Sequence, residues 1–291
     1  MKKNSLTVIR YFLQFGYPPT FKELHTFYPG KISRFQLARE LTTLERENKV
    51  ISSDTDRNNS VKIYTLEGYT ILFQEIKAKI VCSEDKKTKA AGYLKRLSYI
   101  PEIILIGISG TVAMNNAKEK DDIDLFIISR AGRLWTARIK SLFLAELMGV
   151  RRKRDQVVAV KDKVCLNLFF DGSDLQVPPH KQNEYVAHEI LQMKPVISKE
   201  RAYERLLQAN KWVLKYFPNS IPALLPRSVS GEKGSGLFTR ARKDKGAVGY
   251  RLEKLAKKIQ LFFISRHRTR EYVSATQLWF HPEDFAKKVK T

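Results

Sequence analysis

Apolar residues near the amino terminus recur three and four positions apart, which is the spacing of amphipathic helices. The pattern predicts three helices, over residues 6–16, 20–28 and 33–50. Thr20 and Ser33 stand where N-caps are expected, and Glu23 lies three residues after Thr20, as in a capping box. Pro18-Pro19 separates the first two helices. We therefore expect a compact three-helix unit at the start of the chain.

After the third helix the pattern changes to the alternation of strands. Val50-Ile51 and VKIYTL at 61–66 flank a polar segment, which predicts a β-hairpin closed at Asn58-Asn59. Three helices followed by a hairpin resemble a winged helix-turn-helix domain over about the first 70 residues, with the third helix as the candidate reader of nucleic acid. The recognition candidates are Lys31, Arg34, Gln36, Arg39 and, in the wing, Arg57. Winged helices also serve as protein-docking modules, so both uses stay open.

The middle of the chain alternates between strand-like and helix-like segments. A helix over 86–97 precedes a buried strand at 103–106, a turn of small residues, a short helix and a second strand beginning at Asp122. Further elements are expected at 134–147 (helix), 157–160 (strand) and 164–170 (strand). After Asn183 the pattern is helical, apart from a Gly/Ser/Lys-rich loop at 226–246 that we expect to be flexible. The fold class indicated is α/β (α+β), with a small mixed sheet flanked by helices.

Composition narrows the class of protein. The 291 residues include 53 Lys and Arg against 30 Asp and Glu, a formal charge of +23, while 43% are hydrophobic. Such a chain is long enough for about two domains and too apolar for a disordered polycation. The basic excess grows toward the C-terminus, where residues 225–291 hold 16 basic and 6 acidic side chains. A field of this sign attracts phosphates, so nucleotides or nucleic acids are the expected partners.

No apolar run approaches the roughly 18 residues needed to cross a bilayer, and the start of the chain has no cleavage-site pattern. Cys82 and Cys165 are far apart in apolar segments, which fits neither a disulfide framework nor a CxxC metal site. We expect a cytoplasmic protein without membrane contact, in which both cysteines are core residues.

The strongest chemical signal is a pair of carboxylates. Asp122 and Asp124 are two residues apart at the start of a strand, so their side chains project from the same face, about 7 Å apart along the backbone. Two carboxylates converging from one face suit a hard divalent cation such as Mg²⁺, or Mn²⁺, that completes its coordination with water and phosphate oxygens. Metal candidates are therefore Asp122 and Asp124.

A turn of small residues precedes this pair. Ser109, Gly110 and Thr111 lie between a strand and a helix start, where backbone N–H groups and hydroxyls can hold phosphate oxygens. With eleven residues between Gly110 and Asp122, the order strand, turn, helix and strand resembles the signature of the nucleotidyltransferase superfamily. The Ser-Gly doublet is reversed relative to that signature. The resemblance implies a metal bound by Asp122 and Asp124, a nucleoside triphosphate (NTP) as substrate, and transfer of its nucleoside monophosphate to an acceptor.

The superfamily often has a third carboxylate on a later strand. The residue at the corresponding place here is Asn167, which can offer a carbonyl oxygen to a metal but cannot act as a base. Three alternatives follow. Asp171 or Asp174 could substitute for the missing carboxylate, activity could be weak or lost, or Asn167 could be a polar group satisfied within the sheet.

The C-terminal segment contains a basic helix over 250–272. Leu252, Leu255, Ile259 and Phe262 form an apolar stripe expected to face the core. The opposite surface offers Arg266, Arg268 and Arg270 as nucleic-acid contacts, with aromatic residues nearby for stacking. A helix packed on the core with solvated cations is the equally open alternative.

Together these patterns predict three regions: a winged-helix-like domain (1–80), a nucleotidyltransferase core (81–197) and a basic helical region (198–291). The function expected is that of a Mg²⁺-dependent nucleotidyltransferase acting on a nucleic acid, a protein or a small molecule. The alternative is a nucleic-acid-binding regulator whose core senses nucleotide without catalysis.

Overall fold

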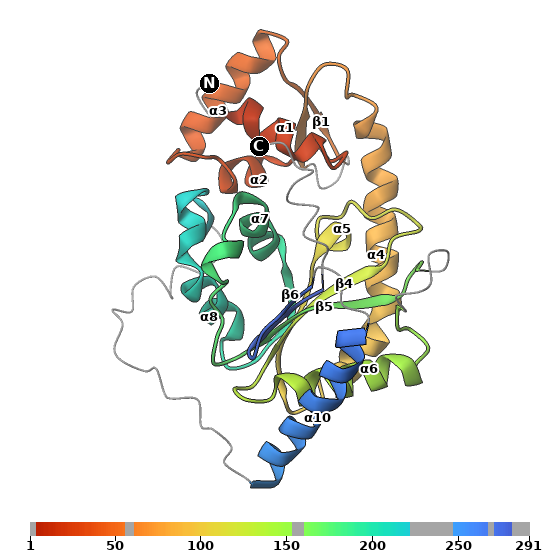
Figure 1. Cartoon of the computed structure of the whole chain (residues 1–291). Coiled ribbons are helices and arrows are strands. Elements are labelled where there is room, and N and C mark those ends of the chain that lie inside the picture. Colours follow the sequence, from red (N-terminus) through yellow and green to blue (C-terminus); the bar gives the residue numbers. More distant parts are fainter. Residues whose placement is uncertain (1–3, 56–60, 153–159, 222–246, 267–270, 281–291) are drawn as a thin grey trace.

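The chain folds into a mixed α/β structure built around one six-stranded sheet (Figure 1). The computed structural model describes residues 4–55, 61–152, 160–221, 247–266 and 271–280. Outside these ranges lie the expected hairpin turn at 58–59, most of the expected strand at 157–160 and the loop at 226–246, together with Arg57, Arg268 and Arg270. The fold class agrees with the sequence prediction.

The amino-terminal unit contains the elements that the pattern predicted. It consists of α1 (Ser5–Leu13), α2 (Phe21–Thr26), α3 (Arg34–Arg46) and the antiparallel pair β1 (Ile51–Asp54) and β2 (Lys62–Thr65). The capping box of Thr20 and Glu23 is present, and Ser33 forms a second one with Gln36. These caps satisfy backbone N–H groups at the helix starts, which is why α2 and α3 begin where they do.

The central sheet has the strand order β6-β3-β4-β5-β8-β7. Its strands are β3 (Ile103–Ile108), β4 (Ile123–Ser129), β5 (Val164–Asp171), β6 (Lys194–Ser198), β7 (Tyr272–Val273) and β8 (Gln277–Trp279). Only β4 and β5 are parallel to each other among the paired strands described. The sheet is therefore mixed, and its parallel pair is the one that carries the predicted site residues.

Helices cover both faces of this sheet, as Figure 1 shows. One face packs against α4 (Leu72–Leu97), α6 (Leu134–Leu147) and α10 (Ala247–Arg266), and the other against α7 (Glu184–Gln192) and α8 (Ala202–Ala209). All six residues of β3 are buried. A strand covered on both faces has no solvent-facing positions, which explains why its sequence is a continuous apolar run.

The amino-terminal unit shares a hydrophobic core with α7 and α8. The imidazole of His188 on α7 is stacked between Tyr11 and Phe27, at ring-centroid distances of 3.9 Å and 4.2 Å. Burial lowers the pKa of His188 well below its usual value, so the ring is neutral and serves as a packing group. Asn219 also accepts from Ile32 N and donates to Gly30 O. The unit is thus fixed to the rest of the chain by several contacts.

Two expectations about element boundaries were wrong. The helix expected at 86–97 begins much earlier, at Leu72, so that α4 continues through the boundary expected at residues 80–81. The region after Asn183, expected to be helical, contributes β6, β7 and β8 to the sheet. These strands have two to five residues and β6 contains Pro195, so they lack the length that makes an alternating pattern recognisable.

The apolar stripe of α10 does not face the core. Leu252, Leu255, Ile259 and Phe262 are 53%, 56%, 41% and 53% exposed, whereas Ala256, Gln260 and Ile264 are buried. Two polar residues explain this choice of face, because Glu253 and Gln260 form hydrogen bonds with α6. None of the helices in the described ranges is long and apolar enough to cross a membrane.

Candidate active site

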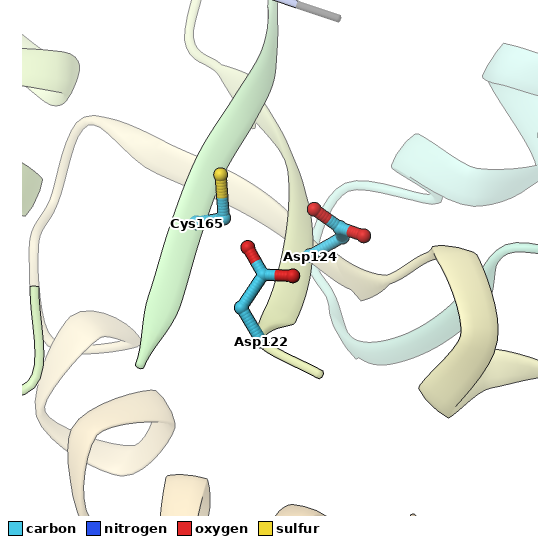
Figure 2. A group of neighbouring side chains, drawn as sticks. All are labelled: Asp122, Asp124 and Cys165. Atoms are coloured by element: carbon cyan, nitrogen blue, oxygen red, sulfur yellow. The ribbon is translucent and has the colours of Figure 1, made fainter. Parts of the chain in front are cut away.

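Asp122, Asp124 and Cys165 converge between the two parallel strands. Asp122 immediately precedes β4, Asp124 is its second residue, and Cys165 on β5 is the register partner of Asp124. Figure 2 shows the three side chains close together, with one carboxylate oxygen of Asp122 pointing toward the Cys165 side chain and Asp124 beside them. One potential ligand atom from each residue lies within 4.8 Å of the others. The predicted Asp pair is therefore brought together, and a thiol that we had assigned to the core lies beside it.

The small-residue turn lies directly against Asp124. The Ser109 N–H donates to the Asp124 carbonyl oxygen over 2.9 Å. Gly110 has φ +64°, and a Cβ atom at this position would lie 2.5 Å from Asp124 Oδ2. Only glycine fits this contact, since it has no Cβ and adopts the left-handed backbone without strain. The turn and the carboxylate pair, which are far apart in sequence, thus form one surface.

The hydroxyl groups of the turn are placed differently from each other. Ser109 is 5% exposed, and its Oγ has no hydrogen-bond partner among the described residues. Thr111 donates through Oγ1 to Asp121 Oδ2 over 3.1 Å, and the same oxygen accepts from Lys118 N. Asp121 therefore braces the loop before β4. The Thr111 hydroxyl is therefore already hydrogen-bonded to Asp121, while the Ser109 hydroxyl is buried without a partner among the described residues.

Asn167 reaches the site as the sequence predicted. It is 6% exposed, and its amide nitrogen donates to Asp124 Oδ1. Its Oδ1 accepts from the Cys165 thiol over 2.5 Å. The pairing register of β4 and β5 shifts between Leu125 and Phe126, which leaves Asn167 as the extra residue of β5. Asn167 is thus a satisfied polar group that also contacts a proposed metal ligand.

Asp171 and Asp174 do not substitute for a third carboxylate. Asp171 is the last residue of β5, four residues beyond Asn167 and so about 13 Å away along the strand. Its carboxylate accepts from Gly132 N, Ser173 N and Ser173 Oγ. Asp174 accepts from the Thr276 hydroxyl over 2.6 Å. Both residues stabilise the connections at the opposite end of the sheet.

The electrostatics of the site favour binding of a cation. Burial and the neighbouring Asp122 carboxylate raise the pKa of Asp124 to about 7, although Arg152 opposes this effect. Burial and the two carboxylates also raise the pKa of the Cys165 thiol. Negative charge at this place is therefore costly without a counter-ion, and a divalent cation would lower both pKa values.

Arg152 is a site residue that the sequence analysis missed. Its guanidinium forms an ion pair with Asp122 and lies 3.7 Å from Cys165 Sγ. Backbone hydrogen bonds between residues 150–152 and Val164 place it there, because they extend the edge of β5. The run of basic residues at 151–154 was visible in the sequence, but its spatial neighbour was not. Arg152 occupies the charge-compensating position that a metal would take.

Lys86 is the second residue that was missed. It is 1% exposed, and its Nζ donates to Glu119 O (2.9 Å), Asp121 O (2.7 Å) and Asp162 Oδ1 (2.8 Å). Burial alone would raise the pKa of Asp162, but Lys86 and Lys89 lower it below its ordinary value. This buried cation holds the loop that delivers Asp122 to the site. A signal existed, since Lys86 lies on the same face of α4 as Ser83, Ala90 and Tyr93.

The predicted nucleic-acid contacts are dispersed. Lys31, Arg34, Gln36 and Arg39 are exposed at and before α3, and Arg266 is exposed at the end of α10. The guanidinium of Arg39 lies 5.9 Å from the ring of Phe35, which is 72% exposed. α10 packs on the first turn of α6, which follows the carboxyl end of β4, whereas Asp122 and Asp124 lie at the amino end. The part of α10 around Glu253 therefore lies near the carboxyl end of β4, away from the carboxylates.

The chain has no detectable counterpart in three comparisons: no family model, no curated protein and no solved structure matches it significantly.

Proposed function

We propose that this chain is a metal-dependent nucleotidyltransferase, which moves a nucleoside monophosphate from an NTP to an acceptor. The observation that carries the proposal is the contact between Gly110 and the Asp124 carboxylate. This contact places a glycine turn with free polar groups beside two carboxylates. Such a turn can bind phosphate, and the carboxylates can bind a metal ion. The resemblance of the spacing at 107–125 to the superfamily signature supports the same assignment.

The donors present fit a divalent cation. Asp122 and Asp124 would hold Mg²⁺ or Mn²⁺, with the Cys165 thiol and the Asn167 amide alongside. A bound cation would neutralise charge on the triphosphate and help to align it for in-line attack by the acceptor. Ser109 Oγ and the backbone of the 109–110 turn would contact phosphate oxygens, since Ser109 Oγ has no partner among the described residues.

Two further cations suit a role in triphosphate binding. Arg152 already lies against Asp122 and can exchange that carboxylate for phosphate oxygens when a metal takes its place. Lys194 pairs through its backbone with Ile108, one residue before Ser109. Burial and the nearby cations Lys22 and Lys87 lower the pKa of Lys194, although Glu23 opposes them. An anion near these three lysines would relieve their mutual repulsion.

A second candidate function is a nucleotide sensor within a nucleic-acid-binding regulator. The observation that favours it is the chemistry of β5, where Asn167 and Cys165 stand near Asp124 in place of a third carboxylate. Neither group is available as a general base near neutral pH, because an amide has no basic site and the raised pKa keeps this thiol protonated. A site of this kind would bind metal and NTP without an efficient proton acceptor.

One experiment separates the two functions. The purified chain is titrated calorimetrically with each NTP in the presence of Mg²⁺, and pyrophosphate release is measured in parallel with total cellular RNA and protein as acceptors. Binding together with pyrophosphate release and labelling of one acceptor fraction supports the transferase. Binding without release supports the sensor. Absence of metal-dependent NTP binding contradicts both.

A further inference from the structure

The exposed stripe of α10 is a surface with an unusual combination of groups. Leu252, Leu255, Ile259 and Phe262 are spaced three, four and three residues apart, which confines them to a sector about 80° wide on one side of the helix. Each is at least 41% exposed. Single exposed apolar residues are common, but a continuous row on one helix face marks an interaction surface.

The stripe is held toward solvent by polar contacts on the packed face. The Glu253 carboxylate accepts from Trp135 N (2.8 Å) and Thr136 N (2.9 Å) at the start of α6. Gln260 donates to Trp135 O and accepts from Arg138 over 2.7 Å. Rotation of α10 to bury the stripe would break these hydrogen bonds and leave buried polar groups unsatisfied. The hydrogen bonds to α6 therefore fix the stripe in its outward orientation.

Positively charged side chains lie along the edge of the stripe that is farther from the face packed on α6. Arg251, Lys254 and Lys258 follow the stripe around the helix, and all three are exposed. The only acidic residue of α10 is Glu253, which α6 engages. The free surface of the helix thus presents an apolar row next to a row of positive charge, and a complementary partner must offer apolar and acidic groups side by side.

This chemistry selects among possible occupants. A second copy of α10 would place cations against cations, which opposes self-association. Single-stranded nucleic acid stacks on a series of aromatic rings. The stripe has one ring, Phe262, with the exposed Phe263 beside it, while its other three residues are aliphatic. The three-four-three spacing is that of the seam between packed helices, in which apolar side chains of one helix fit between those of another.

We propose that α10 is a docking site for an acidic amphipathic helix of a partner protein. The apolar face of that helix covers Leu252, Leu255, Ile259 and Phe262, and its Asp or Glu residues pair with Arg251, Lys254 and Lys258. The surface lies at the end of the sheet opposite Asp122 and Asp124. It is therefore separate from the proposed nucleotide site, and the docking proposal does not depend on the proposed function.

The test uses the full chain and two synthetic helical peptides labelled for fluorescence anisotropy. Both carry Leu at three-four spacing, and they differ only in the flanking residues, which are Glu in one peptide and Lys in the other. We expect the acidic peptide to bind at least about tenfold more tightly than the basic one. The double variant Leu255→Ser/Ile259→Ser should weaken binding by at least about tenfold.

A matched control is available on α6. Phe143 and Leu147 are 70% and 73% exposed but lie outside α10, so Phe143→Ser/Leu147→Ser should leave the affinity unchanged. Lys254→Gln/Lys258→Gln should reduce the preference for the acidic peptide without unfolding the chain. Equal affinity for the two peptides, or no binding of the acidic one, would overturn the proposal. So would stripe-dependent binding to phosphatidylserine vesicles or single-stranded RNA in its place, or stripe-dependent dimerisation.

Discussion

The backbone of Gly110 and the carboxylate of Asp124 are in direct contact, and a Cβ atom at residue 110 would lie 2.5 Å from Asp124 Oδ2. Gly110→Ala should therefore displace the carboxylate and abolish tight binding of Mn²⁺, a paramagnetic substitute for Mg²⁺. The change also imposes a left-handed backbone on alanine, which costs about 1 kcal/mol of stability. Metal affinity by electron paramagnetic resonance and stability by urea unfolding give the two effects separately.

Gly132 provides the control for that variant. It has φ +69°, and no atom lies within 4 Å of a Cβ built there. Gly132→Ala should thus lose a similar amount of stability and keep its metal affinity. If both variants keep their metal affinity, the turn is not part of the site.

The pKa of Asp124 predicts how metal binding depends on pH. Because this pKa is raised to about 7, Asp124 binds a proton in the folded state at pH values where the unfolded chain does not. A metal must displace that proton, so its affinity should fall by up to about tenfold per pH unit below 7 and level off above it. Mn²⁺ titrations from about 1.5 pH units below this pKa to about 1.5 pH units above it check this slope.

The same shift predicts an effect on stability. The raised pKa means that the contribution of Asp124 to the stability of the metal-free protein falls as pH rises from about 4 to about 7. Asp124→Asn removes the buried charge, so its stability relative to the parent chain should increase over this interval. A difference that is constant with pH would show that Asp124 does not titrate there.

The ion pair between Arg152 and Asp122 predicts competition between the guanidinium and a metal. At pH 8, where Asp124 is ionised, Arg152→Gln should raise the affinity for Mn²⁺ several-fold and lower the affinity for NTP. Arg151→Gln is the matched control, since Arg151 pairs with Glu146 on the surface. Equal effects of the two substitutions would show that only the general positive field matters.

The buried hydrogen bonds of Lys86 predict that the stability of the chain and its metal affinity change together. Lys86→Met leaves Asp162 and two backbone carbonyls without their buried partner, which should cost about 3 kcal/mol. The loop before Asp122 should loosen as well, so metal affinity should fall. Lys95→Met changes an exposed lysine on the same helix and should alter stability by less than about 0.5 kcal/mol. A similar result for both variants would contradict the bracing role.

The accuracy of the sequence predictions follows from how local each signal is. The caps of α2 and α3 and the buried strand β3 were predictable, because each depends on residues within a few positions. The approach of the 109–111 turn to Asp122 and Asp124 is not a local signal; it was expected because the spacing resembles the superfamily signature. Arg152, Cys165 and the outward stripe of α10 were not, because their environment is decided by segments that are distant in sequence. For α10 the choice of buried face depended on two hydrogen-bonding residues, Glu253 and Gln260, rather than on its apolar residues.

The central claim is that Asp124 supports nucleotide transfer through a bound divalent metal. The most direct measurement incubates the chain with Mg²⁺ and α-labelled NTP in the presence of cellular RNA and protein, and compares it with Asp124→Asn and with Asp174→Asn, whose carboxylate lies at the other end of the sheet. The account predicts label transfer by the parent chain and by Asp174→Asn, and none by Asp124→Asn in a variant that remains folded. Transfer by folded Asp124→Asn at the parental rate would contradict it.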